Sequence, residues 1–201
     1  MAFEEKALRN IHSAENIGWD PLIYSLIEAN AGEITLLTHS REHGTAVNCM
    51  TILRECGYDS PTITPIITQV GYIKDGTGEK QLFIASHPGT EFKDQVRKRI
   101  GDMFGVTRKA AKEFTRPPGD DLPELIGLPK GVSSPFINSS RYVNFKWMAV
   151  VFDLTEKADT VAIAAGKNST LLIPRAIYET IILTLAETHP ELKIVTFTGE
   201  A

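Results

Sequence analysis

The chain has 201 residues, of which 42% are hydrophobic and 23% charged, and its formal net charge at pH 7 is −4. This composition supplies enough apolar residues for a core and excludes a fibrous or intrinsically disordered chain. No apolar run approaches the roughly 18 residues of a membrane-spanning helix, and the opening residues Met1–Lys6 lack the pattern of a secretion signal. We therefore expect a cytoplasmic protein of one sizeable domain, with no membrane partner.

The N-terminal part of the chain predicts two helices, at residues 2–15 and 19–31. In the second, Asp20 can cap the first turn, and the proline after it has no N–H that the turn would leave unpaired. Apolar residues then recur with helical spacing. We expect residues 1–32 to form a helical extension to a domain that spans residues 33–201.

The rest of the chain alternates between strand and helix patterns. The expected elements are, in chain order, a strand at 33–39, a helix at 46–56, a hairpin of strands at 66–73 and 81–86, helices at 90–104 and 107–114, a helical turn at 120–126, strands at 146–153, 160–165 and 169–173, a helix at 174–188 and a strand at 192–197. Strands joined by hairpins and mixed with helices favour an α+β fold, with a central mixed β-sheet surrounded by helices, over a doubly wound parallel sheet.

The cysteines and histidines do not indicate metal or covalent chemistry. Cys49 and Cys56 are seven residues apart, about two turns along one helix face, which is too far for a disulfide, so we expect two reduced core residues. His39 and His43 have the i, i+4 spacing of metal-binding histidines on a helix, but they lie at a strand end and in a turn. We expect no metal, no cofactor and no reactive thiolate.

A turn at Gly131-Val-Ser-Ser-Pro135 lies before a strand-like run. Gly131 permits an unusual backbone angle, and Pro135 stiffens the exit of the turn. The flanks of Ser133 and Ser134 do not form a nucleophile elbow. Two interpretations stay open, because the turn could present backbone N–H and C=O groups to a polar ligand or could simply lead into the next strand.

A second turn, Ala165-Gly-Lys-Asn168, joins two predicted strands. Gly166 tolerates a positive φ and close backbone approach, and Lys167 offers a cation to a phosphate or a carboxylate. The same residues would also serve as an ordinary tight hairpin turn. Neither turn by itself distinguishes a binding site from a plain connection.

Residues 97–116 form a basic segment, with seven basic residues against two acidic ones. Such a segment could attract the phosphates of a nucleic acid, or it could be a solvated helix face. The candidate phosphate-binding residues within it are Arg97, Lys98, Arg99, Arg108, Lys109 and Lys112.

Taken in order, these features resemble the YbaK family of prolyl-tRNA-editing domains. The resemblance covers roughly residues 33–198, and its most specific part is the Gly-x-x-x-Pro motif at Gly131–Pro135, preceded by Glu-Leu-x-Gly-x-x-x-Gly at Glu124–Gly131. The family implies a compact α+β domain with a central mixed sheet. It also implies hydrolysis of the ester of a mischarged aminoacyl-tRNA, alanine or cysteine on tRNA for proline, with an aminoacyl-tRNA synthetase as a second potential partner.

Carried over to this chain, the resemblance implies a pocket for the aminoacyl group that is shaped by the Gly131–Pro135 turn, with the Ala165–Asn168 turn beside it. It also implies that the basic segment binds the acceptor stem of the tRNA. The ester could then be cleaved by an oriented water and fixed dipoles, without a protein nucleophile. The candidate pocket residues are Gly131, Val132, Ser133, Ser134, Pro135, Gly166, Lys167, Thr68 and His39.

The sequence departs from the family at Thr68. Family members carry a lysine in the strand after the first helix, where it engages the substrate's backbone, and the matching step here is Ile67-Thr-Gln-Val70. A neutral threonine cannot supply that charge. Three functions stay open. The first is a deacylase acting in trans, in which Lys167 or an arginine of residues 97–116 replaces the lysine. The second is a non-catalytic tRNA- or synthetase-binding module on the same fold, and the third is a small-molecule hydrolase that uses Ser133 or Ser134.

Overall fold

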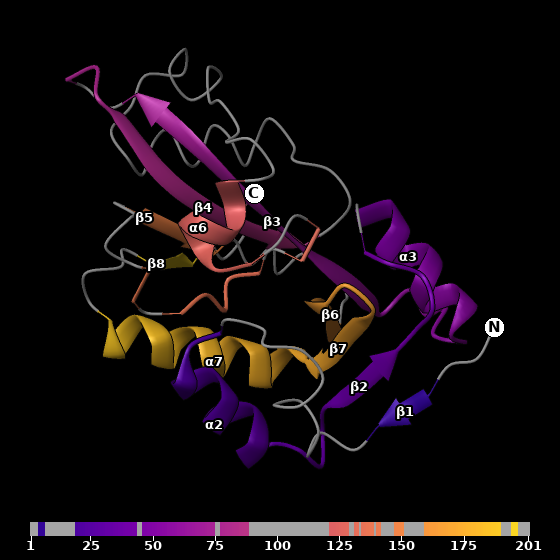
Figure 1. Cartoon of the computed structure of the whole chain (residues 1–201). Coiled ribbons are helices and arrows are strands. Elements are labelled where there is room, and N and C mark those ends of the chain that lie inside the picture. The colour runs from indigo at the N-terminus through magenta and orange to yellow at the C-terminus, as the bar shows by residue number, and fades with distance from the viewer. Residues whose placement is uncertain are drawn as a thin grey trace.

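The computed structural model describes residues 4–6, 19–43, 46–74, 77–88, 121–128, 131–132, 134–138, 140–141, 147–150, 159–189 and 194–196. Within these ranges the chain forms an eight-stranded mixed sheet with four helices (Figure 1). The strand order is β1-β2-β7-β6-β3-β4-β5-β8. The predicted α+β fold with a central mixed sheet is therefore confirmed.

The elements lie close to their predicted positions. The strands are β1 (Glu4–Lys6), β2 (Thr35–Thr38), β3 (Ile63–Lys74), β4 (Lys80–Pro88), β5 (Trp147–Val150), β6 (Thr160–Gly166), β7 (Ser169–Pro174) and β8 (Ile194–Thr196), and the helices are α2 (Pro21–Ala29), α3 (Ala46–Glu55), α6 (Leu122–Ile126) and α7 (Arg175–Thr188). The helices predicted at 90–104 and 107–114 lie outside the described residues. No helix in the described ranges is long and apolar enough to span a membrane.

Strand β1 corrects the prediction of a helix over residues 2–15. Its three residues pair antiparallel with β2, with Glu4 opposite Thr38 and Lys6 opposite Leu36. A short isolated helix is only marginally stable in water, whereas the open edge of β2 offers unpaired N–H and C=O groups to an extended segment. Pairing across the sheet therefore overrides the local helix pattern here.

The β3–β4 hairpin and the β6–β7 hairpin lie side by side in the sheet. β3 and β4 pair antiparallel from Ile66 opposite Pro88 to Lys74 opposite Lys80. The start of β3 runs parallel to β6, whose partner β7 pairs antiparallel with it and with β2. This order brings the β6–β7 turn to the end of β2, although the two are far apart in the sequence.

The two faces of the sheet bury separate cores. On one face, which we call the α7 face, α2, α6 and α7 pack against strand residues such as Leu36 and Leu171. On the other, the α3 face, residues of α3 pack against Leu37 and Leu172. Consecutive residues of a strand point to opposite faces, which explains why these neighbours enter different cores.

Helix α2 belongs to the core of the α7 face. The side chain of Asp20 caps it by accepting the Leu22 N–H at 2.9 Å, as predicted. Ile23 and Ile27 are fully buried in that core. Trp19, just before the helix, packs edge-on against Phe136 with ring centroids 5.4 Å apart. Residues 19–29 are thus packed against strands and helices that follow them in the chain.

We expect Ile27→Ala to lower the free energy of unfolding by about 2–5 kcal/mol, because it leaves a cavity in a packed core. Leu183→Ala is the matched control: it also removes three side-chain carbons, but Leu183 is 51% exposed, and the loss should stay within about 0.5 kcal/mol. Urea titration of both variants measures the difference. If both variants are as stable as the wild type, α2 does not contribute to the cooperative core.

Candidate functional site

Two connections meet beside the α3 face: the loop after β2, which carries His39 and His43, and the β6–β7 turn. The His39 N–H donates to the Asn168 carbonyl oxygen at 2.9 Å, and the His43 N–H donates to the Lys167 carbonyl oxygen at 2.7 Å. Gly166 lies at a β-bulge with a φ of 152°, which L side chains rarely adopt. The structure therefore brings together three residues that the sequence nominated separately, His39, Gly166 and Lys167.

Thr170 links the two histidine rings. His43 Nε2 lies 3.0 Å from the Ser169 carbonyl oxygen and 2.9 Å from Thr170 Oγ1. His39 Nε2 lies 3.1 Å from the same hydroxyl, and His39 Nδ1 lies 2.6 Å from the Arg41 carbonyl oxygen. Because a carbonyl oxygen only accepts, His43 carries its proton on Nε2 and His39 on Nδ1. The single Nε2 proton of His43 is then shared between the Ser169 carbonyl oxygen and the Thr170 hydroxyl, and this hydroxyl donates to His39 Nε2. We call His39, Thr170 and His43 the histidine chain.

Burial keeps both rings of this chain neutral. His39 is 4% and His43 7% exposed, and the rings meet edge-to-face with centroids 4.8 Å apart. Burial lowers the pKa of His39, and burial followed by repulsion from His39 lowers the pKa of His43 to about 4. Since both shifts oppose protonation, the two side chains are uncharged at pH 7.

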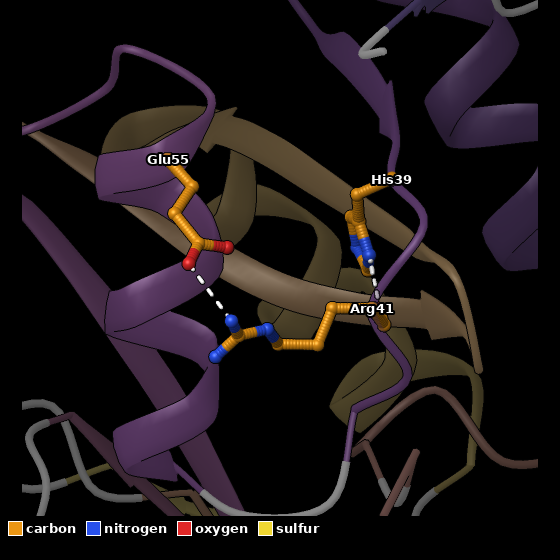
Figure 2. A network of polar contacts seen from close by, with 3 residues as sticks. All are labelled: His39, Arg41 and Glu55. Carbon is orange, nitrogen blue, oxygen red and sulfur yellow. Dashed lines mark hydrogen bonds and ion pairs between the residues drawn. The ribbon is translucent and has the colours of Figure 1, made fainter. Parts of the chain in front are cut away.

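Arg41 anchors the same loop to α3 (Figure 2). Its Nη2 atom lies 2.9 Å from Glu55 Oε1, while its carbonyl oxygen accepts from His39 Nδ1. A partly exposed ion pair of this kind contributes at most about 1 kcal/mol to stability. Its structural effect is to hold the loop between the end of β2 and the helix.

A second group of candidate residues lies on the opposite face of the sheet. Thr68 Oγ1 and Ser86 Oγ are 2.8 Å apart, on directly opposed residues of the β3–β4 hairpin. Ser86 is fully buried, and Thr68 is partly exposed. The next residues on the same side, Val70 and Ile84, belong to the core of the α7 face. Thr68 and the histidine chain are therefore separated by the sheet.

The Gly131–Pro135 turn lies against the α7 face, on the side of Thr68. Gly131 has a φ of 90°, in agreement with the expectation of an unusual backbone angle. Val132 is buried in the same core as Val70, and so is Ile126 of α6, the helix that precedes the turn. Ser134 is 1% exposed, and its Oγ accepts the Phe136 N–H at 3.2 Å, a local turn bond that does not favour a role as nucleophile.

Several predicted residues cannot be placed. Ser133 and the whole basic segment lie outside the described residues, and so do its candidates Arg97, Lys98, Arg99, Arg108, Lys109 and Lys112. Among the residues that are described, no three His, Cys, Asp or Glu side chains gather as metal ligands. Cys49 and Cys56 are free and buried, as predicted, and burial raises the pKa of Cys49 to about 11, so that its thiol stays protonated at pH 7.

Sequence reasoning missed Ser86 and Thr170, and it did not assign a role to His43. The signal that could have found the first two is a hydroxyl residue inside or beside a run of buried apolar residues, since a buried polar group needs a hydrogen-bond partner. Ser86 follows the apolar run Leu82–Ala85, and Thr170 precedes the apolar run Leu171–Ile173.

Neither a protein-family model nor a curated protein sequence matches the chain.

We expect the stability of the protein to rise with pH between about pH 4 and pH 6.5. The pKa of His43 falls from an ordinary 6.5 to about 4 on folding, so the unfolded chain binds more protons in this window, and the free energy of unfolding increases with pH. Neutral His43 thus contributes roughly 3 kcal/mol to the free energy of unfolding. This contribution is fully present above pH 6.5 and is lost as the pH falls to about 4. Burial of His39 acts in the same direction.

The control for this prediction is His43→Gln, because a glutamine side-chain amide can replace the Nε2–H donor without titrating. Urea titrations from pH 4 to pH 7.5 should give a flatter stability curve for the variant than for the wild type. Carboxylates titrate equally in both proteins and cancel in the difference. Parallel curves would show that His43 does not carry the dependence.

Proposed function

We propose that the protein is a cytoplasmic aminoacyl-tRNA deacylase that acts in trans, with the fold of the YbaK and prolyl-tRNA-editing domains. Its substrate would be a tRNA mischarged with a small amino acid such as alanine or cysteine, with tRNA for proline as the first candidate. The observation that carries the proposal is that three residues share one core on the α7 face: Val132 of the Gly131 turn, Val70, two residues after Thr68 in β3, and Ala165, just before Gly166. Three of the segments that the family resemblance nominates thus border a common core.

The Thr68–Ser86 pair offers a neutral donor to the substrate. Ser86 is fully buried, and its Oγ lies 2.8 Å from Thr68 Oγ1, a contact in which either hydroxyl can donate. We assign the donor role to Ser86, because its buried proton then has a partner in Thr68. The proton of the partly exposed Thr68 is then left to donate outward. A neutral hydroxyl suits a carbonyl oxygen better than a phosphate, which charged donors bind more strongly. We therefore assign Thr68 to the ester carbonyl, where negative charge develops during hydrolysis.

The proposed reaction uses a water molecule, the Thr68 hydroxyl and backbone dipoles, and forms no covalent intermediate with the protein. The water oxygen forms a bond to the ester carbonyl carbon, the bond from that carbon to the ribose oxygen breaks, and the water proton passes to the ribose oxygen. The products are the free amino acid and uncharged tRNA. Fixed backbone dipoles around Gly131 and the Thr68 hydroxyl would stabilise the transient negative charge without a covalent intermediate.

Phosphate binding is assigned to cations elsewhere in the chain. Lys167 is exposed on the β6–β7 turn, and residues 97–116 carry seven basic side chains against two acidic ones. Contacts between such cations and phosphates release counterions, so the affinity for tRNA should fall steeply with salt.

The deciding assay measures the release of labelled amino acid from a panel of mischarged tRNAs. The wild type should accelerate release, and Thr68→Val, which keeps the side-chain shape but removes the hydroxyl, should lower kcat/KM by about 100-fold, as expected for loss of a donor to the developing oxyanion. Equal rates for wild type, variant and buffer on every tRNA would rule out the deacylase.

Lys167→Ala should weaken tRNA binding and lower the slope of log Kd against log salt by about 0.7–0.9, the loss of one phosphate contact. Lys80→Ala is the matched control, because Lys80 is also exposed but lies on the β3–β4 hairpin. Filter binding at several salt concentrations measures both slopes. A slope that changes equally in the two variants would contradict a specific role for Lys167.

The second candidate function is a non-catalytic tRNA- or synthetase-binding module on the same fold. The neutral side chain of Thr68, where the related family carries a lysine, is the feature that favours it. Salt-dependent binding of tRNA without ester cleavage in the release assay would support this function and reject the deacylase.

A further inference from the structure

Hydrogen bonds from both the backbone and the side chains tie the loop after β2 to the β6–β7 turn. The His39 and His43 N–H groups donate to the carbonyl oxygens of Asn168 and Lys167. The His43 ring donates to the Ser169 carbonyl oxygen, and the Thr170 hydroxyl bonds to both rings. Every residue from Lys167 to Thr170 therefore has a bond to one of the two histidines.

We propose that His39, Thr170 and His43 form a positioning unit that fixes the β6–β7 turn, and with it Lys167, for substrate binding. The inference rests on the proposed function, since it assigns these residues to the same site. None of the three is expected to touch the substrate. They act through the carbonyl groups on the two sides of the turn.

The turn requires such support because of its own chemistry. Gly166, with a φ of 152° at a bulge, has the backbone freedom of a residue without Cβ. Lys167 is exposed and carries a long side chain. A turn that is ordered before binding loses less conformational entropy when the substrate arrives. The positioning unit holds the turn in one conformation through hydrogen bonds on its buried side.

Every contact of the unit is satisfied when His43 shares its one Nε2 proton between the Ser169 carbonyl oxygen and the Thr170 hydroxyl, and Thr170 donates to His39. His39 Nε2 is an acceptor because its Nδ1 proton is directed at the Arg41 carbonyl oxygen. Protonation of His39 would add a proton on Nε2, and the Thr170 hydroxyl would then accept from His39 and could no longer donate to it. The positioning effect therefore depends on the Thr170 hydroxyl.

The charged groups around the unit come from three elements. Arg41 and Glu42 lie on the loop itself, Glu55 on α3, and Lys167 on the turn. Arg41 is paired with Glu55 at 2.9 Å, and the residues Glu42 and Lys167 lie at the surface. Burial, followed by repulsion from His39, lowers the pKa of His43 to about 4, so this ring is neutral at pH 7.

The test compares Thr170→Val with Thr170→Ser. Valine keeps the branched shape inside the strand but deletes the hydroxyl, and serine keeps the hydroxyl. Amide hydrogen exchange at His39 and His43 reports the bonds to the turn directly. We expect exchange to be about tenfold faster in Thr170→Val, with shifted amide resonances of Gly166 and Lys167, and restored in Thr170→Ser.

Thr184→Val is the matched control, because it deletes a threonine hydroxyl on α7, where the hydroxyl only bonds to the Thr180 carbonyl oxygen. It should leave exchange at the two histidines unchanged. Urea titration confirms that each variant is folded. Wild-type exchange in Thr170→Val, or failure of Thr170→Ser to restore it, would overturn the positioning unit.

The enzymatic arm uses mischarged tRNA and separates binding from chemistry. Thr170→Val should raise KM by about fivefold with little change in kcat, because a disordered turn weakens binding of the substrate and its transition state alike. Unchanged KM would overturn the role in positioning. Because exchange is measured without tRNA, faster exchange in Thr170→Val together with no cleavage by the wild type would keep the structural unit and reject the deacylase.

Discussion

The pairing of β7 with its neighbours is the constraint on which the rest of the structure depends. β7 lies between β2 and β6, and its residues supply both cores: Leu171 and Ile173 pack on the α7 face, and Leu172 on the α3 face. Thr170 shares the α3 side with Leu172. A slip of one residue in this register would exchange the two sides of the strand, placing a leucine beside the histidines and the Thr170 hydroxyl in the apolar core.

The same register decides where polar groups can be buried. Ser86 and Thr170 are fully buried hydroxyls next to apolar runs, and each has a partner on a neighbouring strand or loop. Without such partners their burial would cost about 1–3 kcal/mol each. Because the partners come from distant parts of the chain, each hydroxyl stabilises one particular arrangement of strands. The Thr68–Ser86 pair lies within the β3–β4 hairpin, and the histidine chain joins the loop after β2 to the start of β7.

The separation of these two groups by the sheet gives them different proposed roles. The Thr68–Ser86 pair lies on the same face as the Gly131 turn, where one hydroxyl is partly exposed and could donate to a ligand. The histidine chain is buried on the other face, and its hydrogen bonds end on the backbone of the β6–β7 turn. In the proposed function, the Thr68–Ser86 pair would contact the substrate, and the histidine chain would hold the β6–β7 turn from the other face.

The sequence by itself determined the local features of this protein. The spacing of apolar residues located most strands and helices, because buried side chains recur with a different period in each. The turn sequences also indicated that Gly131 and Gly166 adopt a positive φ, and the structure gives 90° and 152°. Only the tertiary structure decided that residues 4–6 form a strand, that Thr170 joins His39 to His43, and that Thr68 and His39 lie on opposite faces. Those facts depend on the pairing of segments far apart in the chain, which local pattern does not specify.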